Sequence, residues 1–385
     1  MAASAEATAS LESLLPEVHT WSGQPQASEV ALLPGCPAVF LFVDGRGAPV
    51  QLLTAQHLRR VVLSRLSGSP PRTRRADLAG VVRGVRWRPV HSGFETRWWH
   101  YRVARVLHPD GYRKLVGFGP AWFLHIDWSR RVPEPRVTER IWCQPGDCIG
   151  PWPTQRACQQ ALDGLRDVFD LCRYPEQVRK APAGTACAYA EMGRCDAPCD
   201  GSAPLPRYVE RLRAAWAFAA GEIESWMQSA TQRMRHAAAQ QRYELAALLR
   251  QQLEFARLWR ERWLPVVRPA AQLQWLLVLP ATRRKAWKPF LFREGDLTDG
   301  PLIAEHKLAV EVPGWLTGQL SRPAAALDAV VRMEQTWLVA HFLQHREAQS
   351  AIVLHVPQGN APSGLDRLLE EARTRRAAAK DAPPR

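Results

Sequence analysis

The spacing of apolar positions changes along the chain and predicts different elements in each part. Between residues 31 and 130, short apolar runs at 38–43 (AVFLFV) and 121–127 (AWFLHID) predict strands. Apolar residues recur at helical spacing over 52–66 and 94–107, so these two segments predict helices. The combination predicts a small mixed α/β domain in this part of the chain.

The pattern becomes helical from residue 205 to about residue 262. Apolar positions there fall on one helical face and predict two helices folded into a hairpin. The pattern changes again at residue 270, and apolar runs then predict antiparallel strands at 272–280, 288–295, 302–312 and 351–356. A helix is predicted at 323–347, so the C-terminal part combines strands and a helix.

Together these segments predict an α/β fold of the α+β type. A chain of 385 residues is long enough for two or three domains with cores of their own. In chain order, the expected parts are a disordered leader at 1–30, a mixed α/β domain at 31–130, a linker with a cysteine-rich region at 131–204, a helical region at 205–262, a small α+β module at 270–360 and a basic tail at 361–385.

A group of cysteines in the linker follows a C-x14-C-x7-C-x3-C pattern, formed by Cys172, Cys187, Cys195 and Cys199. Four thiolates brought together suit a tetrahedral zinc ion or an iron–sulphur cluster, and the ligand types alone do not separate the two. The alternative is a set of buried thiols that pack as small hydrophobic side chains. Disulfides are disfavoured, because the N-terminus lacks a secretory signal. The pattern predicts a metal or cluster site whose type is open.

The charge balance indicates a polyanionic partner. Lys and Arg number 51 against 37 Asp and Glu, which gives a net charge of +14. Nucleic acid is the leading candidate, an anionic membrane surface is the second, and arginines scattered without a binding face are the alternative to both. The candidate DNA contacts are Arg59, Arg60, Arg65, Arg72, Arg74 and Arg75. No apolar run is long enough to span a membrane, so we expect a cytoplasmic protein.

Residues 32–260 resemble the UvrC family, the nuclease subunit of bacterial nucleotide excision repair. The resemblance lies in GPWP at 150–153, MGRCDAPC at 192–199 and the helical stretch Met234–Phe255. It implies a GIY-YIG nuclease fold for the N-terminal domain and a [4Fe–4S] cluster on the cysteines, with zinc as the alternative. It also implies that the helical stretch is a UVR motif that docks a UvrB-type partner. The implied partner contacts are Met234, Tyr243, Glu244, Ala247, Leu249, Arg250 and Leu253.

The nuclease positions depart from the family pattern. A GIY-YIG site needs two tyrosines, an arginine and a metal-binding glutamate, and the first three align with Phe40, Gln51 and Val61. Glu95 matches the glutamate, although the helix dipole alone also favours a carboxylate at the start of a helix. Because each lost electrostatic donor costs about 10²–10³ in rate, the resemblance implies a nuclease fold with a decayed site. Mg²⁺ or Mn²⁺ is expected only if the nuclease is active.

Three functions are open at this level. The first is a repair-associated subunit without nuclease activity that binds DNA and docks a UvrB-type partner. The second is an active endonuclease that makes a single incision through a rearranged site around Glu95, His57 and Arg59. The third is an iron–sulphur cluster sensor whose oxidation state changes the affinity for DNA. The family's second, RNase H-like nuclease domain is not recognised in residues 270–360, whose role is open.

Overall fold

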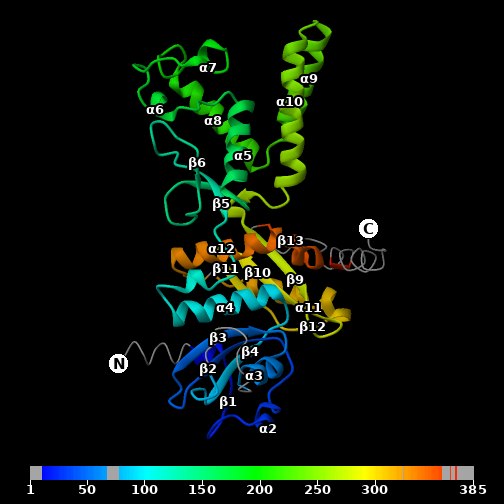
Figure 1. Ribbon diagram of the computed structural model, residues 1–385. Coiled ribbons are helices and arrows are strands. Elements are labelled where there is room, and N and C mark those ends of the chain that lie inside the picture. Colours follow the sequence, from blue (N-terminus) through cyan, green and yellow to red (C-terminus); the bar gives the residue numbers. More distant parts are fainter. Residues whose placement is uncertain (1–10, 67–77, 324, 358–364, 366–368, 371–385) are drawn as a thin grey trace.

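The chain forms two lobes, and its N-terminal and C-terminal parts share the first of them (Figure 1). The structure is a computed structural model that describes residues 11–66, 78–323, 325–357, 365 and 369–370. The first lobe contains two antiparallel sheets, and the second contains a third sheet together with the cysteine region and a projecting helical hairpin. The described part of the chain is therefore α+β, as the sequence predicts.

The N-terminal sheet is covered by helices on both faces. Its antiparallel strands run in the order β1 (Glu17–Thr20), β4 (Gly84–Pro89), β2 (Ala38–Val43) and β3 (Pro49–Ala55). The covering helices are α2 (Ala27–Val30), α3 (Leu58–Leu66) and α4 (Gly93–Leu107). Because side chains alternate along a strand, Phe40 and Phe42 of β2 face α2 and α3, whereas Val39 and Leu41 face α4. Every residue of β2 is consequently buried.

Residues 17–30 are folded, although the sequence predicts a disordered leader up to residue 30. Glu17–Thr20 forms the edge strand β1 along β4, and Trp21 and Val30 are buried against the same sheet. The side chains of β1 are mostly exposed, as expected for an edge strand, so the apolar pattern of the sequence did not reveal it.

The C-terminal sheet also carries helices on both faces. Its strands in spatial order are β11 (Asp296–Asp299), β10 (Ala286–Arg293), β9 (Gln274–Pro280) and β13 (Ile352–His355), with β12 (Ile303–Ala304) also paired to β10. One face packs against α4 and α12 (Ala329–Gln344), and the other packs against α11 (Leu308–Leu320). The strand predicted at 302–312 is wrong beyond Ala304, because Leu308, Val312 and Leu316 recur every four residues and form the buried face of α11.

Both sheets of the first lobe pack against α4. The ring centroid of Phe94 in α4 lies 5.2 Å from that of Phe290 in β10 and 4.6 Å from that of Phe342 in α12. The same hydrophobic core contains Val39 and Leu41 of the N-terminal sheet. The described residues between 270 and 357 therefore complete the core of the N-terminal domain.

The second lobe lies between these two parts in the sequence. Its sheet has the order β6 (Arg136–Thr138), β5 (Trp122–Ile126), β7 (Asp147–Trp152) and β8 (Arg268–Pro269). Its helices are α5 (Gln155–Val168), the short α6 (Pro175–Val178) and α7 (Ala188–Glu191), then α8 (Leu205–Ala220), α9 (Glu224–Ala239) and α10 (Tyr243–Leu258). No helix in the described part of the chain combines the length and the apolar composition that a membrane crossing requires.

The region predicted as a two-helix hairpin contains three helices. The chain turns after α8 at Gly221, whose φ is +122°, and again after α9 at Gln241, whose φ is +60°. Helices α9 and α10 form the hairpin that projects from the lobe (Figure 1). Its base is held where α5 approaches α10, since a Cβ atom on Gly164 would lie only 2.1 Å from the Phe255 ring.

Candidate functional site

Glu95, the candidate metal ligand, is buried near the N-terminus of α4, and only 1% of its surface is exposed. Its Oε2 atom accepts a hydrogen bond from the backbone N–H of His91 at 2.7 Å. Its Oε1 atom lies 2.6 Å from Nζ of Lys288, which comes from β10 in the C-terminal sheet. The same ammonium group lies 2.6 Å from the carboxylate of Asp299 in β11. Both oxygens of Glu95 are thus bound to donors.

The C-terminal part also closes the start of α4. The backbone N–H of Phe94 donates to Glu347 at 2.8 Å, and the second oxygen of Glu347 pairs with Arg97 at 2.6 Å. A carboxylate at a helix N-terminus is favoured because it binds otherwise unpaired N–H groups and interacts with the helix dipole. The backbone N–H of Thr282 donates to the carbonyl of His91 at 2.9 Å. Segments around residues 282, 288 and 347 therefore cover the position of Glu95.

The charges around Glu95 compensate one another. Burial on its own would lower the pKa of Lys288, but the carboxylates of Glu95 and Asp299 outweigh burial and raise this pKa above its ordinary value. Lys288 is therefore positively charged at neutral pH, and it neutralises Glu95 where a metal ion would otherwise do so. A divalent cation does not fit this site, because the ammonium group occupies the position facing Oε1 and Oε2 is already bonded.

The other aligned nuclease positions face a hydrophobic core. Phe40 is fully buried and Val61 packs against the same core on the α3 side of the sheet. Gln51 lies opposite Phe42 in the strand register, so it shares this face, and its side-chain oxygen is buried without a hydrogen-bond partner among the described residues. Glu95 instead lies on α4, the helix that covers the other face.

The rearranged site predicted around Glu95, His57 and Arg59 is not formed by hydrogen bonds or ion pairs in the described part of the chain. Nε of Arg59 donates to the carbonyl of Leu33 at 2.7 Å. Nδ1 of His57 accepts from the backbone N–H of Arg60 at 3.4 Å, a contact at the start of α3. Both side chains therefore make local contacts around α3.

The candidate DNA-contacting arginines are only partly visible in the structure. Arg59 and Arg60 are exposed on α3, and Arg65 on the same helix is half-buried. The remaining candidates, Arg72, Arg74 and Arg75, lie outside the described residues. The structure thus presents two exposed cationic side chains of the predicted set on one helix.

The structure brings two of the predicted cysteine ligands into contact. A side-chain interaction with Cys172 lowers the pKa of Cys195 to about 6 although burial opposes the shift, and Sγ of Cys172 itself donates to the carbonyl of Tyr174 at 3.4 Å. The backbone N–H of Ala197 and the charge of Arg211 lower this pKa further. The pKa of Cys172 is correspondingly raised by its interaction with Cys195 and by burial. The two side chains are therefore close enough for the ionisation of one to oppose that of the other.

The other two cysteines lie within electrostatic reach of this pair. Cys187 acts on the pKa of Cys172, and Cys195 acts on that of Cys199. Cys199 is held by its carbonyl, which accepts from the N–H of Gly184 at 2.7 Å. Four thiols suit zinc or an iron–sulphur cluster in their donor chemistry. However, no three His, Cys, Asp or Glu side chains among the described residues, which include all four cysteines, are arranged to hold a metal ion.

The predicted partner contacts divide between two faces of the hairpin. Leu249 and Leu253 are buried between α9 and α10, with exposed fractions of 4% and 2%. Met234 of α9 is half-buried. The exposed members of the set are Tyr243, Glu244, Ala247 and Arg250, and Tyr243 is 69% exposed at the start of α10. The apolar stripe therefore holds the hairpin together, and a second, mixed face is open to solvent.

Comparison with known proteins identifies the second lobe. Residues 121–218 match the profile of the UvrC/Cho excinuclease middle domain, a range that runs from β5 through the cysteine region into α8. A UvrABC system protein C from Desulforudis audaxviator is 26% identical over 365 residues, which cover 90% of this chain and 57% of that protein. The second lobe thus contains a UvrC/Cho middle domain, and the chain as a whole is similar to UvrC proteins.

Further UvrC relatives match a shorter part of this chain. UvrABC system protein C from Lactobacillus helveticus is 27% identical over 229 residues, and the protein of that name from Tropheryma whipplei is 24% identical over 226 residues. The chain spans 37% of the length of each of these two relatives and 57% of the Desulforudis protein. No solved structure matches the chain.

Sequence reasoning missed Lys288, the side chain that decides the chemistry around Glu95. The segment KPFLFREG was assigned to a strand, and β10 confirms this. A lysine beside a continuous apolar run is itself a signal, because a charged side chain rarely lies in a buried strand without an opposite charge. The identity of its partners, however, was not accessible from local sequence, since Glu95 lies 193 residues away.

Replacement of Lys288 tests the ion pair in this UvrC-like protein. Lys288→Met leaves Glu95 buried without a cation, so we expect the free energy of unfolding to fall by about 3–5 kcal/mol. The double variant Glu95→Gln/Lys288→Met removes both charges and should recover most of this loss. Urea unfolding followed by circular dichroism measures both effects.

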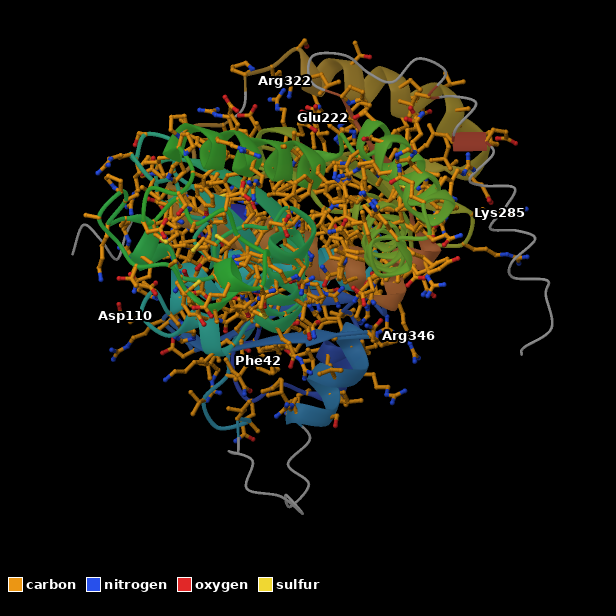
Figure 2. The ribbon with its side chains drawn as sticks, turned by 90° about the horizontal axis from the view of Figure 1, so that it is seen from above. Phe42, Asp110, Glu222, Lys285, Arg322 and Arg346 are labelled. Atoms are coloured by element: carbon orange, nitrogen blue, oxygen red, sulfur yellow. The ribbon has the colours of Figure 1, made fainter. Side chains whose placement is uncertain are left out.

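The matched control is Lys285→Met, at an exposed lysine that Figure 2 shows at the periphery of the molecule. We expect this control to change stability by no more than about 0.5 kcal/mol. A Lys288→Met protein as stable as the control would mean that Glu95 is accessible to water in solution.

Proposed function

We propose that this UvrC-like protein is a DNA-binding subunit of excision repair that docks a UvrB-type partner and does not itself cut DNA. The observation that carries the proposal is the ion pair between Glu95 and Lys288, at 2.6 Å and with Glu95 1% exposed. A carboxylate that binds a catalytic metal needs open coordination positions next to it, and this one has none.

The surroundings of the aligned catalytic positions support the same conclusion. Phosphodiester hydrolysis requires a group that positions and deprotonates water and a cation that stabilises the phosphate charge. Phe40 and Val61 are apolar, and the amide of Gln51 does neither task at neutral pH. The absence of these catalytic groups and the neutralisation of Glu95 are two separate reasons. Each of them alone would lower the rate of phosphodiester hydrolysis strongly.

The hairpin supplies the surface proposed for the partner. Tyr243 and Leu245 are 69% and 43% exposed at the start of α10, next to the turn between α9 and α10. Glu244 and Arg250 are exposed on the same helix. An exposed aromatic residue flanked by charged groups is a typical arrangement for a protein contact, in which the apolar part supplies affinity and the charges supply orientation. A helical hairpin of the partner would meet this face.

The DNA-binding part of the proposal is supported by charge. The chain carries a net charge of +14, and exposed Arg59 and Arg60 lie on α3. Contacts of this kind recognise phosphates irrespective of the base sequence and weaken as the salt concentration rises. We propose these two side chains as members of the DNA-binding surface.

The cysteine region is proposed to hold a [4Fe–4S] cluster, with zinc as the alternative. Cys172 and Cys195 already interact, and Cys187 and Cys199 would have to move toward them to complete the ligand set, because no three of these side chains are gathered in the described structure. A bound cluster or ion would cross-link the loops between α5 and α8, a region that otherwise relies on short helices. The Arg211–Asp196 ion pair already ties the Cys195 segment to α8.

The central test scores incision and binding in one reaction. It contains anaerobically purified protein, Mg²⁺ or Mn²⁺, a UvrB-type partner and a labelled duplex that carries a lesion. We expect salt-sensitive binding without a cut, both for the native protein and for Glu95→Gln. A cut that Glu95→Gln abolishes would establish the endonuclease alternative, and an absence of binding would overturn the DNA-binding part.

Substitutions in the hairpin test the partner surface. Tyr243→Ala and Arg250→Glu remove exposed groups, so we expect partner affinity to fall at least about tenfold while the melting temperature stays unchanged. Arg346→Glu, an exposed arginine of the first lobe, is the control for the charge change. Affinities are measured by calorimetry with the UvrB-type partner. Equal affinity of the control and the hairpin variants would exclude this face as the docking site.

Metal analysis tests the cysteine proposal. Protein purified without oxygen should contain iron and inorganic sulfide, or zinc, and Cys195→Ser should lose them because it removes the thiolate of the contacting pair. Cys36→Ser serves as the control, since Cys36 lies in the N-terminal domain, outside the cysteine region. Native protein free of iron and zinc would contradict the proposal.

A further inference from the structure

A cleft of about 960 Å³ lies beside α4 in the first lobe. It is bounded by α4, by β11 and by the segment that joins α11 to α12. Its volume lies in the range of about 300–1,000 Å³ that is typical of small-molecule sites. None of the nuclease, cysteine or hairpin positions discussed above, apart from Asp299, lines this cleft.

Three arginines give the cleft a positive lining. Arg102 and Arg105 extend from α4, and Arg322 joins them from the segment after α11. Among the described residues, none of the three guanidinium groups forms an ion pair with a carboxylate. Arg102 is half-buried, with its guanidinium carbon 4.5 Å from the ring centroid of Trp99. Burial and the nearby charge of Arg88 lower the pKa of Arg102, although the carboxylates of Asp299 and Asp296 act in the opposite direction.

One carboxylate faces the same space. Asp296 lines the cleft, and burial raises its pKa even though a backbone hydrogen bond from Ala325 and the charges of Arg293 and Arg102 act against this shift. Asp299 is at the cleft as well, but it is already paired with Lys288. A ligand that satisfies this lining must carry an anionic group for the arginines and hydrogen-bond donors for Asp296. Inorganic phosphate alone supplies the anionic group but too few hydrogen-bond donors for Asp296.

The wall behind these groups is fixed by a buried hydrogen-bond network. Glu334 of α12 is 2% exposed and accepts hydrogen bonds from Tyr101 at 2.8 Å, Tyr112 at 2.6 Å and Arg113 at 2.7 Å. Tyr101 and Tyr112 both line the cleft. Because their hydroxyl groups are held from behind, the cleft is shaped before any ligand enters, which lowers the entropic cost of binding.

We propose that this cleft binds a nucleoside phosphate, with the phosphate at Arg105 and Arg322 and the donors of the base or sugar at Asp296. The apolar side chains around Leu297 and Val331 form the remaining wall for the base. The ligand is either a free nucleotide or a nucleotide within a single strand of DNA, since both present the same chemistry. This inference goes beyond the proposed function, because it depends on neither the hairpin nor the cysteines.

The test compares four probes by calorimetry with the full chain: a nucleoside 5′-monophosphate, the nucleoside, inorganic phosphate and a 5′-phosphorylated tetranucleotide. We expect the monophosphate to bind at least about tenfold more tightly than the nucleoside or phosphate, since only it engages both sets of groups. A tetranucleotide that binds more tightly still assigns the cleft to a DNA strand. Binding of the monophosphate without the tetranucleotide assigns it to a free nucleotide.

The variant Arg105→Gln/Arg322→Gln should weaken the binding probe at least about tenfold without a change in melting temperature, because neither side chain has an ion-pair partner to lose. Arg346→Gln is the matched control, and Figure 2 shows Arg322 and Arg346 at separate places on the periphery. Binding that survives the double variant, or no binding of any probe, would overturn the proposal.

Discussion

The ion pair between Glu95 and Lys288 is the interaction on which the first lobe depends. A buried carboxylate without a cation is strongly unfavourable, and the side chain that neutralises this one comes from the far end of the chain. The same helix terminus is capped by Glu347 and packed against Phe290 through Phe94. Charge, capping and apolar packing at the start of α4 therefore all require the C-terminal sheet.

This arrangement explains why the N-terminal and C-terminal parts form one body and the middle of the chain another. Helix α4 is packed by both sheets of the first lobe, so neither sheet has a complete core without the other. The second lobe has its own core around Trp152, Phe218 and Trp259, while Phe123 of β5 and Cys148 of β7 also pack into the core around α4. A hairpin that projects from the second lobe can engage a partner without disturbing the core around α4.

The local sequence predicts the helices and strands better than it predicts which of them pack against one another. The strand predicted at 38–43 and the helix predicted at 94–107 agree with β2 and α4. In both cases the apolar pattern that defines the element lies within the segment itself. The apolar pattern does not reveal the edge strand β1, because the side chains of β1 are mostly exposed. It predicts a strand at the start of α11, because β-branched residues there are also typical of strands.

The candidate sites likewise show that local features are predicted from the sequence and long-range contacts are not. The spacing predicts a site of four cysteines, and among the described residues Cys172 and Cys195 interact, whereas no three of the four are gathered around one point. Glu95 was recognised from its local motif, but its partner was not, because pairing between residues 193 positions apart is set by tertiary packing alone. The clefts and ion pairs of the first lobe arise from contacts of this long-range kind.

In this fold Glu95 cannot both pair with Lys288 and bind a metal ion. To bind a metal ion, Glu95 would have to exchange the ammonium group of Lys288 for a cation that arrives from solvent, yet only 1% of its surface is exposed. Access would require β10 to move away from α4, and that movement would separate Phe94 from Phe290 and uncover the core that both ends of the chain share. Removal of Lys288 alone would not open the site, because Glu347 and the segment around Thr282 still cover the start of α4. The carboxylate that resembles a catalytic residue is therefore a structural one, and the stability of the first lobe depends on its being unavailable to a metal.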